Sequence, residues 1–115
     1  MITNAYILDW TMNEYNKLLA QLKEENFEVI PEKNSEDVRV AVPFSRVDDF
    51  ADRVMEHLNA PYNYVDIQYP IEKTTVVIFQ QKKLFITNEV DNNAAKKWAI
   101  DQGLPVEQAD WATSY

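Results

Sequence analysis

The spacing of apolar residues switches several times between a period of two, typical of strands, and a period near 3.6, typical of helices. Apolar side chains fall on one helical face in Thr11–Leu22 and again in Ser45–Leu58. Between and around them, Phe27–Ile30 and Val38–Val42 alternate, and each run stops at a proline. These switches predict a mixed α+β domain.

Side chains that can cap a helix mark where the first two helices are expected to begin. Thr11 and Glu14 have the capping-box spacing, in which the hydroxyl and the carboxylate satisfy free backbone N–H groups. Ser45 precedes the second helix, and Asp48 in its first turn favours the positive end of the helix dipole. The two helices are therefore predicted to start at Thr11 and just after Ser45.

Four more runs have the composition of strands, and the last two form a hairpin. They are Ala5–Leu8, Tyr62–Tyr69, Thr74–Phe79 and Leu84–Thr87, and the hairpin loop is Gln80–Lys83.

A third helix is predicted from about Asp91 to Gly103. The segment Gly103-Leu104-Pro105 is a strong stop signal, because glycine accepts the left-handed conformation and proline cannot continue a helix.

The predicted order is β-α-β-β-α-β-β-β-α in a single domain spanning residues 1–115. Its first six elements have the order of the split βαβ, ferredoxin-like arrangement, an antiparallel sheet with helices mainly on one face. A different antiparallel sheet covered by helices remains an alternative. Because Thr75–Phe79 is apolar on both faces, the second face of the sheet also needs a cover. Either the appended hairpin and C-terminal helix with Trp98, or a second copy of the chain, is expected to supply it.

The chain contains one histidine, one glycine and no cysteine. Imidazole, thiolate and glycine-rich phosphate loops are the groups on which small enzymes commonly rely. We therefore expect no cofactor and no metal, and binding is favoured over catalysis. The absence of cysteine and of a signal-peptide pattern favours the cytoplasm, and no apolar run is long enough for a membrane.

The formal net charge is −8, from 19 acidic and 11 basic side chains. A surface of this sign repels a phosphate backbone, and the pairs Lys82-Lys83 and Lys96-Lys97 are too few to make a basic patch. The same charge attracts a basic protein. The sequence thus argues against nucleic acid and favours a protein partner with basic character.

Two kinds of side chain are candidates for contact with a partner. Carboxylates recur every four residues along the second helix, where they form either a solvated face or a weak site for a hard cation. Tyrosine and tryptophan are frequent in this short chain and are common binding anchors. The predicted partner-binding set is Asp48, Asp52, Glu56, Tyr62, Tyr64 and Trp111.

An acid-base enzyme is the catalytic alternative. Asp9 beside Trp10, and Asp66 in a tyrosine-rich strand, would gain raised pKa values if they were buried among aromatic rings. His57 is expected to cap or pack at the end of the second helix. The leading hypothesis is a non-enzymatic protein-binding or regulatory module with an acidic, tyrosine-rich surface. The alternatives are a dimeric structural subunit or small-ligand binder, and a cofactor-free enzyme using Asp9, Asp66 or His57.

Overall fold

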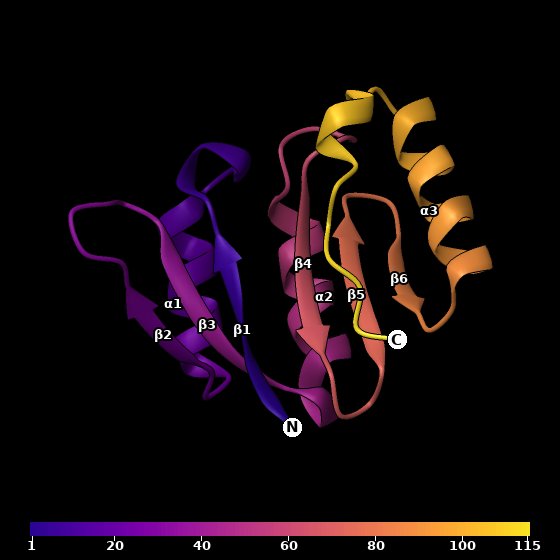
Figure 1. Cartoon of the computed structure of the whole chain (residues 1–115). Coiled ribbons are helices and arrows are strands. Elements are labelled where there is room, and N and C mark those ends of the chain that lie inside the picture. The colour runs from indigo at the N-terminus through magenta and orange to yellow at the C-terminus, as the bar shows by residue number, and fades with distance from the viewer.

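The computed structural model describes residues 1–115 and is an α+β domain of six strands and three α-helices (Figure 1). No helix combines the length and the apolar character that crossing a bilayer demands. The strands are β1 (Ile2–Ile7), β2 (Glu28–Pro31), β3 (Val38–Pro43), β4 (Tyr64–Tyr69), β5 (Thr74–Phe79) and β6 (Lys83–Ile86). The helices are α1 (Tyr15–Glu24), α2 (Val47–His57) and α3 (Glu89–Asp101), and short 3-10 turns cover Asp9–Thr11, Phe44–Arg46 and Val106–Gln108.

The strands form two antiparallel three-stranded sheets, ordered β1-β3-β2 and β4-β5-β6. The two sheets meet where β1 lies beside β4, and these strands run in opposite directions (Figure 1). The element order is the predicted one. The ferredoxin-like arrangement is compatible with it, although that arrangement pairs the first and fourth strands, and here no backbone hydrogen bond joins β1 to β4.

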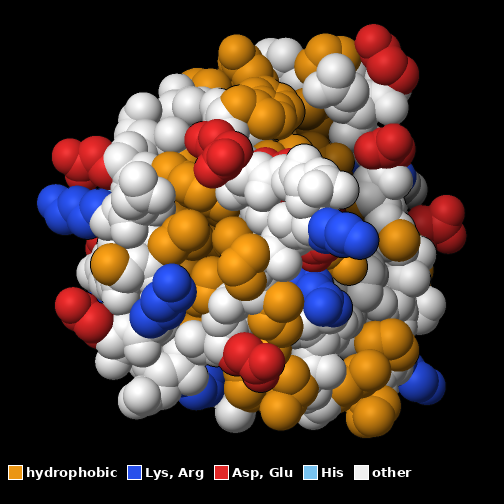
Figure 2. All heavy atoms as spheres, turned by 90° about the vertical axis from the view of Figure 1, so that its left-hand side faces the viewer, with side chains coloured by type: hydrophobic (Ala, Val, Ile, Leu, Met, Phe, Trp, Pro, Cys, Tyr) orange, Lys and Arg blue, Asp and Glu red, His pale blue; other side chains and the backbone are white.

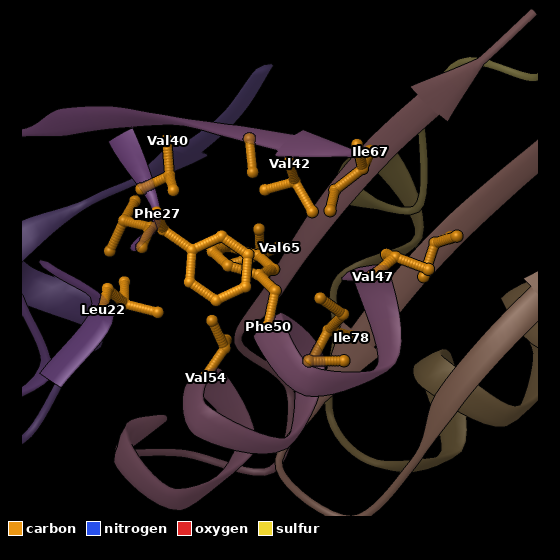
Figure 3. Close-up of a cluster of buried hydrophobic side chains, with 14 of the residues drawn as sticks. Leu22, Phe27, Val40, Val42, Val47, Phe50, Val54, Val65, Ile67 and Ile78 are labelled. Carbon is orange, nitrogen blue, oxygen red and sulfur yellow. The ribbon is translucent and has the colours of Figure 1, made fainter. Parts of the chain in front are cut away.

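The first core lies between the two sheets and the pair α1 and α2. Figure 3 shows Phe50 of α2 at its centre, surrounded by side chains from both sheets. Phe27 meets the Phe50 ring edge-on, with ring centroids 5.8 Å apart. Val65 and Ile67 of β4 enter the same core. Full burial of such a side chain contributes about 1.5–3 kcal/mol, so this core joins the two sheets even though β1 and β4 are unpaired.

A second core covers the other face of β4-β5-β6. All six residues of β5 are buried, and Val77 and Phe79 point away from the first core. They contact Ala95 and Ala99, two small residues on one face of α3, and they also contact Trp111 from the C-terminal tail. The predicted cover of the second face is therefore supplied within the chain. It extends over the β4-β5-β6 sheet and leaves the corresponding face of β1-β3-β2 free of helices (Figure 1).

The predicted start of the first helix is wrong, and so is the predicted Ser45 cap of the second. The Thr11 hydroxyl donates to the carbonyl of Leu8 at 2.6 Å instead of capping a helix, and α1 begins at Tyr15. Met12 forms an isolated bridge with Leu58, which holds this segment extended. Helix α2 begins at Val47 without a side-chain cap, because Ser45 lies within the preceding 3-10 turn.

The third helix follows its signals more closely. Asn88 caps it by accepting the N–H of Asp91 at 2.9 Å, and the helix begins at Glu89, two residues before the predicted start. The predicted stop at Gly103 is confirmed: its φ is +108°, and the next residue, Leu104, is buried and donates its N–H to Ala99 O at 3.1 Å.

The edge of β1 that faces β4 carries free backbone groups. Phe44 N–H donates to Met1 O at 2.9 Å, which sets the alternation of hydrogen-bonded pairs between β1 and β3. Thr3, Ala5 and Ile7 then bond to β3. The N–H and C=O groups of Asn4 and Tyr6 point the other way, toward β4.

The facing edge of β4 has the same property. Phe79 N–H donates to Lys82 O at 2.7 Å, so the alternate residues of β5 bond to β6 and the intervening ones bond to β4. By this alternation Tyr64, Asp66 and Gln68 direct their backbone groups toward β1. We refer to the space between the two unpaired edges as the β1–β4 gap.

Amide hydrogen exchange tests this assignment. Amides that face the β1–β4 gap have no acceptor within the chain, so we expect them to exchange about tenfold or more faster than amides bonded within a sheet. The first group is Asn4, Tyr6, Asp66 and Gln68, and the second is Ala5, Ile7, Val65 and Ile67. Residue-resolved exchange by NMR measures both groups on the same strands. Equal protection of the two groups would show that β1 and β4 are paired in solution.

Candidate binding groove

An open groove of about 600 Å³ lies over the β1–β4 gap, on the face away from α1 and α2. One wall comes from β1 and the turn after it, the other from β4 and the segment before it, and the C-terminal tail adds three residues. The lining residues are Thr3, Asn4, Tyr6, Leu8, Trp10, Thr11, Tyr62, Asn63, Tyr64, Val65, Asp66, Gln68, Leu104, Gln108 and Asp110.

Aromatic rings stand exposed in this groove. Trp10 is 69% exposed, Tyr6 56% and Tyr62 44%, and all three are lining residues. Tyr6 projects into the groove because it alternates with Ala5 and Ile7, which are buried in the first core. Large rings left in solvent are costly in an isolated domain and are typical anchors of binding surfaces.

The only ionisable side chains in the groove besides tyrosines are two carboxylates, Asp66 and Asp110. Asp66 accepts a hydrogen bond from Gln68 Nε2 at 3.0 Å. No lysine, arginine or histidine is among the lining residues. On neighbouring β3, Arg39 lies 3.4 Å from Glu32 and is paired with it. The groove is therefore a locally negative site with aromatic walls.

The tail is held in place by hydrogen bonds to β4. The Tyr64 hydroxyl donates to Gln108 O at 3.0 Å, and Gln68 Nε2 donates to Ala112 O at 2.9 Å. Burial, together with the charges of Asp110 and Asp66, raises the pKa of Tyr64 to about 12. Tyr64 therefore stays a neutral donor throughout the physiological range and fixes the wall on which Asp110 stands.

The structure divides the predicted partner-binding set. Tyr62 and Tyr64 lie in the groove, as described. Trp111 is only 5% exposed, and its indole N–H donates to Asn92 Oδ1 at 2.8 Å inside the second core. It is thus a packing residue and is not available to a partner.

The predicted carboxylates of α2 lie outside the groove. Lys83 Nζ is 3.0 Å from Asp48 and 2.8 Å from Asp52, so one ammonium group neutralises part of the stripe. Its hydrogen bonds, first to Asp52 and then to Asp48, raise the pKa of Lys83. Glu56 accepts from Arg53 at 2.9 Å. The three carboxylates are therefore paired with basic side chains on the surface of α2, and none of them lies in the groove with Tyr62 and Tyr64.

The three residues of the catalytic alternative do not converge. Asp66 lines the groove, but Asp9 and His57 do not. Asp9 lies in the 3-10 turn after β1, where its N–H donates to Asp37 at 2.9 Å. His57 is buried at the end of α2, and its Nδ1 lies 2.8 Å from Asn13 O. Since a carbonyl oxygen only accepts, this nitrogen carries the hydrogen, and the ring fastens the segment before α1 to the end of α2.

Several groove residues escaped the sequence interpretation. Asn4 was missed because the first strand was predicted to begin at Ala5, whereas it begins at Ile2. Tyr6 lies within the predicted strand, and the alternation of that strand would have placed it, like Asn4, opposite the buried Ala5 and Ile7. Nothing in the sequence pattern indicated Asp110, which reaches the groove only because the tail runs along β4.

Comparison of the chain with protein families, with curated proteins and with solved structures gives no match. The function is therefore inferred from the geometry of the groove.

Replacing Tyr64 with phenylalanine tests how the wall is held. We expect a loss of about 1 kcal/mol in the free energy of unfolding near neutral pH, because one hydrogen bond to the tail disappears. Above pH 10 the unfolded phenol ionises while the folded one keeps its proton to about pH 12, so wild-type stability falls as pH rises. The decline should be shallower in the variant. Urea unfolding at a series of alkaline pH values measures this, and identical slopes would contradict it.

Proposed function

We propose that the chain is a non-enzymatic binding module that holds a protein partner with basic character in the groove over the β1–β4 gap. One observation carries this proposal: exposed aromatic rings and two carboxylates share a groove whose lining contains no cationic side chain. Lysine and arginine of a partner are attracted to aromatic faces as well as to carboxylates, so both features favour the same ligand chemistry.

Long-range electrostatics supports the same partner. The net charge of −8 accelerates encounter with a basic surface, and salt weakens the effect. Asp66 and Asp110 then provide charge at short range, and Trp10 and Tyr62 provide apolar area. By occupying the surface of that partner, the chain would block the partner's other contacts and so regulate it.

Catalysis is a weaker proposal for the same groove. Asp66 is the one candidate of the catalytic alternative that lines it. Its carboxylate accepts a hydrogen bond from Gln68, whose amide orients the carboxylate and cannot take a proton from it. General acid-base chemistry normally requires a second group at hydrogen-bond distance from the reacting atom. The geometry therefore favours binding.

Affinity capture with matched variants tests the proposal. Asp66→Asn with Asp110→Asn removes the groove carboxylates, and Asp48→Asn with Asp52→Asn removes the same charge from α2. We expect a basic protein captured by the wild type at low salt to be released at high salt. The groove variant should retain it about tenfold or more weakly than the α2 variant does. Equal capture by both variants, or loss in the α2 variant alone, would remove the groove from the proposal.

Self-association is a second candidate, favoured by the helix-free face of β1-β3-β2. Ile2 is 64% exposed there and shares one face of β1 with Asn4 and Tyr6. Figure 2 shows hydrophobic side chains gathered in a band on the side of the molecule where this sheet lies. A symmetric pair of chains would cover such a band.

Sedimentation analysis at micromolar concentration tests this second candidate. We expect the mass of two chains, and the mass of one chain for Ile2→Glu, because a carboxylate would be buried without a partner. A single-chain mass for the wild type would exclude self-association at that concentration and leave the groove proposal untouched.

A further inference from the structure

Several polar side chains of the groove use their hydrogen-bond donors within the chain. Gln68 Nε2 donates to Asp66 at 3.0 Å and to Ala112 O at 2.9 Å, which accounts for both of its hydrogens. The hydroxyl groups of Tyr64 and Thr11 each donate to a backbone carbonyl, at 3.0 Å and 2.6 Å. None of these three lining side chains has a hydrogen left for a ligand.

Asn63 continues this pattern and leaves an acceptor free in the groove. It lines the groove and is only 9% exposed. Asn59 donates its side-chain amide to Trp10 O at 2.9 Å, so Asn59 Oδ1 is the atom that meets Asn63 and accepts from its Nδ2 at 2.7 Å. No donor in the chain bonds to Asn63 Oδ1. This oxygen is not sealed in the core either, because the polar side-chain atoms buried without a partner belong to Arg39 and Glu72.

The two carboxylates of the groove also lack a basic partner within the chain. Neither Asp66 nor Asp110 forms a salt bridge, whereas the carboxylates of α2 are paired with lysine or arginine. Both lie close enough to the Tyr64 hydroxyl for their charges to raise its pKa, so the two negative charges stand in the same part of the groove. Like charges without a counter-ion repel each other, and a cation from outside would relieve that repulsion.

A ligand that complements this groove carries hydrogen-bond donors and a positive charge. Among the polar groups that internal hydrogen bonds hold in place, those still free are acceptors, and the exposed apolar surface is aromatic. Guanidinium has five N–H donors in a planar fork, accepts no hydrogen bond and stacks on aromatic rings. An ammonium group has three donors and no planar face. Phosphate brings only acceptors and like charge, and each saccharide hydroxyl accepts as well as donates.

The shape of the groove suits a single side chain. β1 and β4 lie side by side beneath it (Figure 1), so a side chain can enter from the open side while the backbone of the partner stays outside. The Tyr62 ring is held beside the end of α3, since a β-carbon added at Gly103 would lie 3.4 Å from its Cδ1. Asn59 fixes the backbone of Trp10. Because these walls are in place beforehand, less entropy is lost on binding.

We propose that the groove recognises an arginine side chain on the surface of the partner protein. Its guanidinium group bonds to Asp66, Asp110 and Asn63 Oδ1 and stacks on the exposed rings. This inference rests on the proposed function and specifies which basic side chain of the partner is recognised. Lysine is a compact point charge that satisfies the carboxylates but cannot also stack and reach the amide oxygen.

Four short peptides test the proposal without altering the protein. Each is a blocked pentapeptide of glycine and serine around one central residue, which is arginine, lysine, citrulline or glutamate. Citrulline keeps the planar shape of arginine, but it is neutral and carries an acceptor oxygen in place of a donor group. Shifts of the backbone amide signals of isotope-labelled protein, measured by NMR during titration at low salt, give both the affinities and the site.

We expect the arginine peptide to shift the amide signals of residues that line the groove. It should bind about fivefold or more tightly than the lysine peptide. The citrulline peptide should bind about tenfold or more weakly than the arginine peptide, because hydrogen bonds between charged groups are stronger than those from a neutral donor. The glutamate peptide should not bind.

Variants of the chain locate the binding. The groove variant of the capture experiment should weaken the arginine peptide about tenfold or more, and its α2 control should change the affinity less than about twofold. Trp10→Ala should weaken it about threefold or more, whereas Ile71→Ala, which truncates a side chain 74% exposed outside the groove, should not. Asn63→Ala should reduce the preference for arginine over lysine to about twofold or less, a ratio that a loss of folded protein would not change.

The outcomes separate this inference from the function on which it rests. Equal affinity for the arginine and lysine peptides, or for the arginine and citrulline peptides, would overturn arginine recognition. Shifts confined to amides outside the groove, or no shifts at about 10 mM arginine peptide, would do the same. If affinity capture still depended on the groove carboxylates, the proposed protein-binding function would survive these results. If capture did not depend on them either, both proposals would fail.

Discussion

Burial of β5 on both faces organises the whole domain. Val76 and Ile78 belong to the first core, and Val77 and Phe79 to the second. A strand that is apolar on both sides is stable only between two layers, so α2 must cover one face and α3 with the tail must cover the other. The path of the tail follows from this requirement. To place Trp111 on Phe79 it runs along β4, and in doing so it brings Asp110 to the groove.

The first core also explains why β1 and β4 can lie side by side without pairing. The first core holds β1 and β4 together through side chains such as Val65 and Ile7, so stability does not require that their backbones pair. An unpaired edge is normally a liability, because it can join the strands of another chain. Here the edges lie within the fold, beneath a groove with exposed rings and carboxylates. Because β1 and β4 lie side by side there (Figure 1), neither edge is open to a strand of another chain.

Sequence patterns recovered the elements better than the contacts between them. The alternation of Val65 with Tyr64, and the apolar character of β5 on both faces, correctly predicted which sides would be buried. The glycine stop of α3 was also correct, because it depends on neighbours only a few residues away. The capping box at Thr11 failed for the opposite reason. A bridge between Met12 and Leu58, far apart in the sequence, holds the segment extended and overrides the local preference.

The sequence alone determined the order of strands and helices, the faces they bury, the acidic charge and the shortage of catalytic side chains. These properties depend on composition and on short-range periodicity, which are local. Only the tertiary structure decided that Trp111 is internal, that Lys83 neutralises Asp48 and Asp52, and that Asp66 faces the groove while Asp9 does not. Only the tertiary structure showed that β1 and β4 do not pair. Whether two strands pair depends on how segments far apart in the sequence pack together, and no local pattern encodes the separation of their backbones.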